Sequence, residues 1–205
     1  MPLLTWAILL LVIIAPMLVA AQSPLLAWRD PVYITAGFAG IAAMALLLLQ
    51  PLLAAGLLPG LTLKRTRQVH RWTGSLLVAA VLLHVFTLWL TSPPDVIDVL
   101  LFASPTPFSI WGVIAMWLVL LSAAIAALRR RLNLSPRTWV LSHTVLAAII
   151  VICSVIHALL IEGTMGTVTK WMLCLVTLAV TIKVIADKWK SHVRPRPQTR
   201  LRSRV

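Results

Sequence analysis

The stretches HRWTGSLLVAAVLLH (residues 70–84) and HTVLAAIIVICSVIH (residues 143–157) each begin and end with a histidine and are largely apolar in between. In both, the histidines are 14 positions apart (84 − 70 and 157 − 143). Along an α-helix, 14 residues fall about 40° short of four full turns and rise about 21 Å, so each pair shares one helix face at two depths. If the two helices face each other, His70 meets His143 and His84 meets His157.

The composition is that of an integral membrane protein. Of the 205 residues, 60 % are hydrophobic and 11 % are charged, which lies outside the range of soluble domains. Apolar runs long enough to cross about 30 Å of hydrocarbon predict six transmembrane helices, over residues 3–21, 32–58, 71–90, 109–128, 139–161 and 168–186. We therefore expect an all-α integral membrane protein, with a six-transmembrane-helix bundle as one domain over residues 1–187 and a basic cytoplasmic tail over residues 188–205.

Two of these runs carry a local ambiguity. The first ends in small residues that a signal peptidase could use, but no basic segment precedes it, so we expect a retained span. The second is over-long and contains Pro51, so we expect a kink or an end in the membrane interface.

The basic residues predict how the chain is oriented. Sixteen of the 18 lysines and arginines fall in residues 64–71, 129–137 and 183–204, which lie on one side of the predicted bundle. By the positive-inside rule that side is the cytoplasm, so both termini are cytoplasmic. We expect a bacterial inner (plasma) membrane protein whose partner is the lipid bilayer, and the net charge of +13 does not indicate nucleic acid.

The histidine pairs fit haem. A neutral imidazole is a good axial ligand for haem iron, and two of them favour electron transfer over binding of a substrate at the metal. The residues four positions from each histidine are small and would leave room for a porphyrin: Gly74, Ala80, Ala147 and Cys153. We predict two haem b groups, an inner one on His70 and His143 and an outer one on His84 and His157.

Other residues are assigned roles around these haems. Leu77 and Ile150, midway between the two levels, would separate them. Arg71, and more weakly Arg137, could neutralise the propionates of the inner haem.

Simpler readings stay open. An intramembrane histidine often only hydrogen-bonds between helices. A bare zinc or copper ion fits poorly, because ligands about 21 Å apart cannot share one ion and each level offers two histidines without a nearby carboxylate or thiolate pair. Cys153 and Cys174 lie in apolar runs and are expected to be packing residues.

The sequence resembles the ferric reductase-like transmembrane domain family, which is shared by ferric reductases, NADPH oxidases and the haem-binding membrane subunit of bacterial methionine sulfoxide reductase systems. The resemblance covers residues 32–187. It is carried by the Arg67-x-x-His70-Arg71-x-x-Gly74 motif, by His84, and by the second histidine pair. It implies six helices around two stacked b-type haems, which carry electrons from a cytoplasmic flavin to an acceptor on the far side.

The chain departs from the family's oxidases in one respect. No Gly-x-Gly occurs anywhere, so a dinucleotide-binding fingerprint is absent. We therefore expect electrons from a separate flavoprotein reductase, from quinol, or from FMN or FAD bound by the inner loops.

The leading hypothesis is a di-haem b-type transmembrane electron-transfer protein that delivers electrons to ferric iron, oxygen or a periplasmic redox partner. It would be the membrane component of an oxidoreductase. The alternative is a non-catalytic membrane anchor, or a haem-binding subunit of a methionine sulfoxide reductase-type or other oxidoreductase complex. A small transporter with a histidine proton relay is less well supported, because the first five apolar runs contain no acidic residue.

Overall fold

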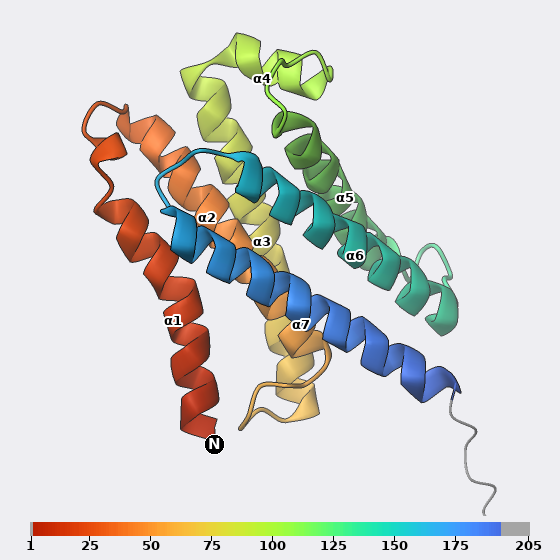
Figure 1. Cartoon of the computed structure of the whole chain (residues 1–205). Coiled ribbons are helices and arrows are strands. Elements are labelled where there is room, and N and C mark those ends of the chain that lie inside the picture. The colour runs from red at the N-terminus through yellow and green to blue at the C-terminus, as the bar shows by residue number, and fades with distance from the viewer. Residues whose placement is uncertain (1, 194–205) are drawn as a thin grey trace, which may run out of the picture.

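The computed structural model describes residues 2–193, with side chains to residue 190. This part of the chain is helical and contains no strand (Figure 1). Its elements are α1 (Pro2–Ala21), the 3-10 helix η1 (Pro24–Leu26), α2 (Pro31–Ala54), α3 (Leu63–Thr91), α4 (Pro93–Leu100), α5 (Ser109–Leu128), α6 (Pro136–Leu160) and α7 (Thr167–Val193). All but η1 and α4 are long and apolar enough to span a membrane. The prediction of an all-α, six-span integral membrane fold is confirmed.

The bundle is organised as pairs of sequence-adjacent helices. Helix α3 packs along α2, and α6 packs along α5, while α7 lies against α1, α2 and α6. The two histidine helices, α3 and α6, scarcely contact each other. Only 11 % of the α3 span is buried, against 44 % of the α2 span, so α3 has a long face that no other helix covers.

Two helices begin earlier than hydropathy predicts. Helix α3 begins at Leu63 rather than at residue 71, and α6 begins at Pro136 rather than at residue 139. The side chain of Thr62 accepts a hydrogen bond from the Arg65 N–H at 3.4 Å, and Ser135 caps α6 in the same way. A hydropathy reading stops at charged residues, whereas a helix continues through them to its N-cap.

Helix α2 ends earlier than predicted, at Ala54 rather than at residue 58. Gly56 adopts a φ of 66°, the left-handed conformation that glycine allows. The N–H of Leu57 donates to the carbonyl of Leu52 at 3.0 Å, and that of Gly56 donates to Leu53 at 3.1 Å. This Schellman motif stops the helix inside an apolar run that continues beyond it.

Two further features differ from the prediction. The loop between α3 and α5 contains α4, a short helix that begins at Pro93 and carries Asp95 in its first turn. Helix α7 continues to Val193, past the predicted start of the basic tail at residue 188. The predicted tail residues 194–205 lie outside the described residues.

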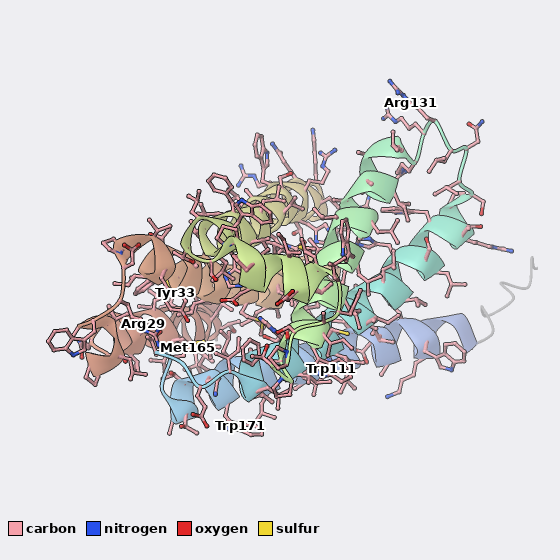
Figure 2. All side chains as sticks on the ribbon, turned by 90° about the horizontal axis from the view of Figure 1, so that it is seen from above. Arg29, Tyr33, Trp111, Arg131, Met165 and Trp171 are labelled. Carbon is pink, nitrogen blue, oxygen red and sulfur yellow. The ribbon has the colours of Figure 1, made fainter. Side chains whose placement is uncertain are left out.

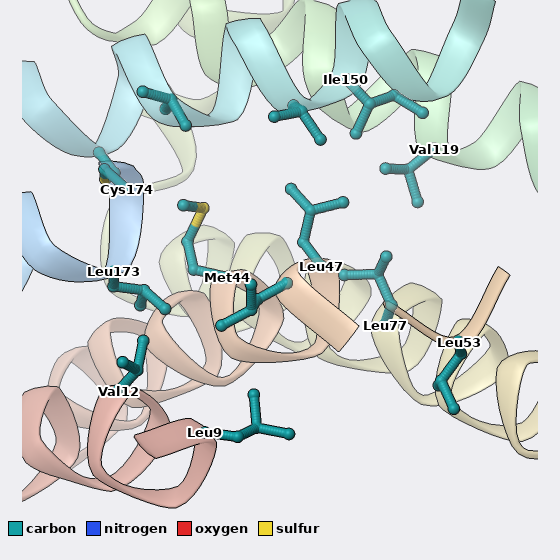
Figure 3. Close-up of a cluster of buried hydrophobic side chains, with 14 of the residues drawn as sticks. Leu9, Val12, Met44, Leu47, Leu53, Leu77, Val119, Ile150, Leu173 and Cys174 are labelled. Carbon is teal, nitrogen blue, oxygen red and sulfur yellow. The ribbon is translucent and has the colours of Figure 1, made fainter. Parts of the chain in front are cut away.

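One apolar cluster joins the six long helices (Figure 3). Leu9 and Val12 bring α1 into this cluster, so the first apolar run packs as part of the bundle. Leu77 of α3 and Ile150 of α6 are both buried members of it. They form an apolar layer midway between the two levels of histidines.

The connections divide between the two ends of the bundle. The start of α1, the α2–α3 connection, the α5–α6 connection and the end of α7 lie toward the same end, along the lower and right-hand sides of Figure 1. Figure 2 shows Arg131, in the α5–α6 connection, far from Arg29 and Tyr33 at the opposite end. The fold therefore gathers the basic segments at one end of the molecule.

Candidate functional site

The inner histidines face each other across the bundle. The ring centres of His70 on α3 and His143 on α6 are 6.2 Å apart, and their planes are 80° apart. With a metal–imidazole bond of about 2.0 Å and the ring centre about 1.1 Å beyond the nitrogen, imidazoles on opposite sides of one iron have centres about 6.2 Å apart. The spacing of this pair therefore fits two axial ligands of one haem.

The outer histidines lie one level further along the same helices. No ring-to-ring contact joins His84 and His157 within residues 2–190. Each imidazole instead forms a hydrogen bond with a backbone carbonyl of the segment that precedes its own helix. Nδ1 of His84 is 2.7 Å from the carbonyl oxygen of Ala36 on α2, and Nδ1 of His157 is 2.8 Å from that of Phe108, just before α5.

These two hydrogen bonds decide which ring nitrogen carries the proton. A carbonyl oxygen can only accept a hydrogen bond, so Nδ1 of His84 and of His157 must carry the proton and donate it. In a neutral imidazole the other nitrogen, Nε2, then has a free lone pair. Metal-binding histidines commonly show this arrangement, in which the second nitrogen is fixed by a carbonyl or carboxylate.

The inner histidines have comparable neighbours. Nδ1 of His143 is 3.1 Å from the hydroxyl oxygen of Ser122 on α5. Nδ1 of His70 is buried next to the backbone carbonyl of Gln50 on α2, but no hydrogen bond of normal geometry links them. In each of the four histidines, Nδ1 thus lies next to a residue of the preceding helix or, for His157, of its N-cap; we call these four neighbours the backing residues.

The backing residues repeat with the spacing of the histidines. On α2, Ala36 and Gln50 are 14 positions apart (50 − 36), and the corresponding Phe108 and Ser122 are also 14 apart (122 − 108). The hairpin α2–α3 is therefore repeated as α5–α6. Sequence analysis missed this repeat, because three of its members, Ala36, Gln50 and Phe108, offer backbone carbonyls, which leave no mark on residue type.

An aromatic side chain adjoins the inner pair. The ring of Trp139 stacks on that of His143, with centres 4.9 Å apart and planes 20° apart. The guanidinium of Arg129 lies 5.4 Å from the centre of the same Trp139 ring. Trp139 therefore contacts a site residue and belongs to the site.

The structure places the other predicted site residues less directly. Arg71 lines a shallow surface groove with Gln68, Trp72 and Ser75. A Cβ on Gly74 would lie 3.5 Å from Oε1 of Gln50, so Gly74 faces α2. The haem-binding roles of Arg71 and Gly74 stay predictions.

Lys188 is a basic residue near the inner pair that sequence analysis did not assign there. It lies on the last turns of α7, and its charge reaches both His70 and His143. The prediction missed it because hydropathy placed the end of the last helix at residue 186. The continuation of the helix places this cation at the same end of the bundle as the inner histidines.

Neither histidine level resembles a bare-metal site. In the described part of the chain, no group of three or more histidine, cysteine, aspartate or glutamate side chains is placed to hold a metal ion. Cys153 and Cys174 are buried and unpaired. Two imidazoles per level would fit a metal whose other positions are filled by a macrocycle.

Partly buried histidines at two levels of an all-helical membrane bundle indicate a membrane redox component. Residues 36–154 match the family described as "Ferric reductase like transmembrane component". The chain belongs to this family, as its sequence predicts. The matched region includes His70, His84 and His143 and ends three positions before His157 (157 − 154). No curated protein and no solved structure was found to match the chain.

Proposed function

We propose that this chain is a di-haem b-type cytochrome that conducts electrons across the membrane. The observation that carries the proposal is the 6.2 Å separation of the His70 and His143 rings, together with the Nδ1 bonds that leave Nε2 of His84 and His157 free. When bound, each haem would supply one reversible electron at its iron. The chain's own residues orient the ligands, exclude water and keep the two levels apart.

The surroundings of the histidines support an electron conductor. The buried layer of Leu77 and Ile150 lies between the two levels, so water and ions are excluded there. Two imidazoles at each level would leave no open coordination position for a substrate. Electrons, which need no channel, could then pass where molecules could not.

The direction and the partners form part of the same proposal. The basic end of the bundle is assigned to the cytoplasm of a bacterial inner membrane, so electrons enter near His70 and His143 and leave near His84 and His157. The donor is a separate flavoprotein reductase, quinol, or a flavin held by the inner loops. The acceptor is ferric iron, oxygen or a periplasmic redox partner.

The test is haem content combined with ligand replacement. The full chain, purified in mild detergent, is expected to give the difference spectrum of a low-spin b-type cytochrome with two haems per chain. His84→Ala or His157→Ala is expected to remove one haem, and His70→Ala or His143→Ala the other. A folded, monodisperse protein without haem would contradict the proposal and favour the membrane-anchor alternative.

Transfer itself is measured in proteoliposomes. A reductant trapped inside is expected to reduce an impermeant ferric complex outside only when both haems are present. His84→Ala and His157→Ala vesicles, which retain the inner haem, are the matched controls and should be inactive.

A further inference from the structure

Two glycines lie directly against the outer histidines. A Cβ on Gly112 of α5 would be 2.6 Å from Cε1 and 2.7 Å from Nδ1 of His157. A Cβ on Gly40 of α2 would be 3.2 Å from Nδ1 and 3.3 Å from Cε1 of His84. Carbon atoms pack at about 3.5–4.0 Å, so any side chain at these positions would displace the ring, more at Gly112 than at Gly40.

Both glycines stand in the same relation to the hydrogen-bonded carbonyl. Gly40 is four positions after Ala36, and Gly112 is four after Phe108, whose carbonyls accept the Nδ1–H of His84 and His157. Residues four apart lie on the same face of a helix. Each imidazole ring therefore occupies the space that a side chain at the glycine would fill. The same ring donates a hydrogen bond to the carbonyl one helical turn earlier.

We infer that Gly40 and Gly112 are positioning residues for the outer pair of haem ligands. Together with the carbonyls of Ala36 and Phe108, each forms a notch that fixes the position of an imidazole and its protonated nitrogen. The inference rests on the proposed haem function of His84 and His157. It assigns the outer level a backbone support, in contrast to the hydroxyl of Ser122 at His143 on the inner level.

The chain contains a matched control for this effect. Gly37 also lies within α2, and a Cβ there would meet nothing within 4 Å. Gly37→Ala adds the same methyl group and the same helix propensity without touching a histidine. It separates displacement of the ring from any general effect of replacing a helical glycine.

The experiment compares Gly112→Ala, Gly40→Ala and Gly37→Ala with the natural chain, using haem content, the low-spin electron paramagnetic resonance signal and midpoint potentials. Gly112→Ala should lower the haem content from two per chain to one. Gly40→Ala, where a shift of a few tenths of an ångström suffices, should keep both haems but change the resonance and the potential of the outer one. Gly37→Ala should change none of these readouts.

Two controls keep the inference separate from folding and from the proposed function. In a His157→Ala background the ring is absent, so adding Gly112→Ala should cause no further loss of folded protein or of the remaining haem. A further loss in that background would overturn the inference, as would an unchanged outer haem in both Gly112→Ala and Gly40→Ala. A natural chain that folds without haem would instead refute the proposed function.

Discussion

The environment of a single imidazole decides what that residue can do. In this protein a ring could donate from either nitrogen, and the carbonyls of Ala36 on α2 and of Phe108, just before α5, select Nδ1 in His84 and His157. A bond of this kind orients the ring and increases the basicity of the nitrogen that binds metal. The residue behind a ligand can therefore tune a haem as well as hold it.

Ser122→Ala tests this tuning at the inner level. Ligation through Nε2 would make Nδ1 of His143 a donor to the Ser122 hydroxyl, 3.1 Å away. Removing that acceptor makes the imidazole a weaker electron donor, so the ferric state loses stability. A neutral hydrogen bond contributes about 1 kcal/mol, which corresponds to roughly 40 mV for one electron. Redox titration should show the inner haem potential rising by up to that amount, with the outer potential unchanged.

A second variant checks that the hydroxyl group itself sets the potential of the inner haem. Ser122→Thr keeps the hydroxyl and should restore the natural potential. An inner potential that moves downward in Ser122→Ala would contradict the assigned direction of the hydrogen bond.

Trp139→Ala is expected to loosen the inner site. Its ring stacks on His143 with centres 4.9 Å apart, and aromatic pairs contribute about 0.5–1.5 kcal/mol beyond their buried area. Without that ring, the inner haem should be lost several times faster to an excess of a haem-binding protein. Trp139→Phe, which retains an aromatic face, should recover most of the retention. Equal loss rates in all three proteins would show that Trp139 does not support the inner site.

The four histidines could be predicted at this scale, and their supports could not. A 14-residue spacing is visible in the sequence because helix geometry converts it directly into a shared face. The carbonyls of Ala36 and Phe108 belong to residues of unremarkable type, and only the recurrence of Gly40 and Gly112 four positions later leaves a trace. Such a trace is too weak to read before the helix pairs are known.

At the scale of elements, the repeated hairpins α2–α3 and α5–α6 explain how α3 and α6 stay apart. Each histidine helix is held by the preceding helix, so the faces that carry the rings need not pack against each other. A helix in a compact bundle normally buries such a face. In this fold the second helix of each hairpin instead contributes one histidine to the inner pair, His70 from α3 and His143 from α6.

The helix boundaries show which local signals hydropathy misses. Helix α5 occupies residues 109–128 as predicted, because apolar residues fill it from end to end. Helix α3 extends eight positions beyond the prediction, since its basic first turns lie past the apolar run but are still helical. Helix α4 was missed because eight residues that begin with two prolines are typical of a loop.

Lys170→Met tests how the outer end of α6 is held. Nζ of Lys170 donates to the carbonyls of Leu159 at 3.3 Å and Ile161 at 2.7 Å, at the negative end of the helix dipole. Hydrogen bonds from a charged group contribute about 1.5–3 kcal/mol when desolvated, and less where water competes. We expect the free energy of unfolding to fall by about 1 kcal/mol, seen in detergent as a melting temperature about 2–4 °C lower.

A second lysine provides the comparison. Lys183 pairs with Asp187 at 2.6 Å, but both side chains are more than half exposed (61 % and 54 %). An exposed pair contributes little, so Lys183→Met should leave the melting temperature unchanged within error. A larger loss in Lys183→Met than in Lys170→Met would refute the role given to the Lys170 cap.

At the scale of the whole molecule, the charged loops and the two histidine levels are arranged along the same axis. The basic connections lie at the end nearer His70 and His143, and the acidic loop with α4 lies at the end nearer His84 and His157. The number of spans could be predicted from the sequence because the length of the apolar runs suffices for it. The orientation that the loop charges indicate stays a prediction. The approach of Lys188 to the inner pair could not be predicted, because it depends on how far α7 continues and where it crosses α6.

The orientation can be measured with single reactive thiols. The native Cys153 and Cys174 are buried, so they should give little background with a membrane-impermeant maleimide. Asp98→Cys, in α4, should react in intact spheroplasts. Arg131→Cys, in the α5–α6 connection at the other end of the bundle, should react only after the membrane is permeabilised. The opposite pattern would place His70 and His143 at the outer surface, so electrons entering at the basic end would have to come from outside the cell.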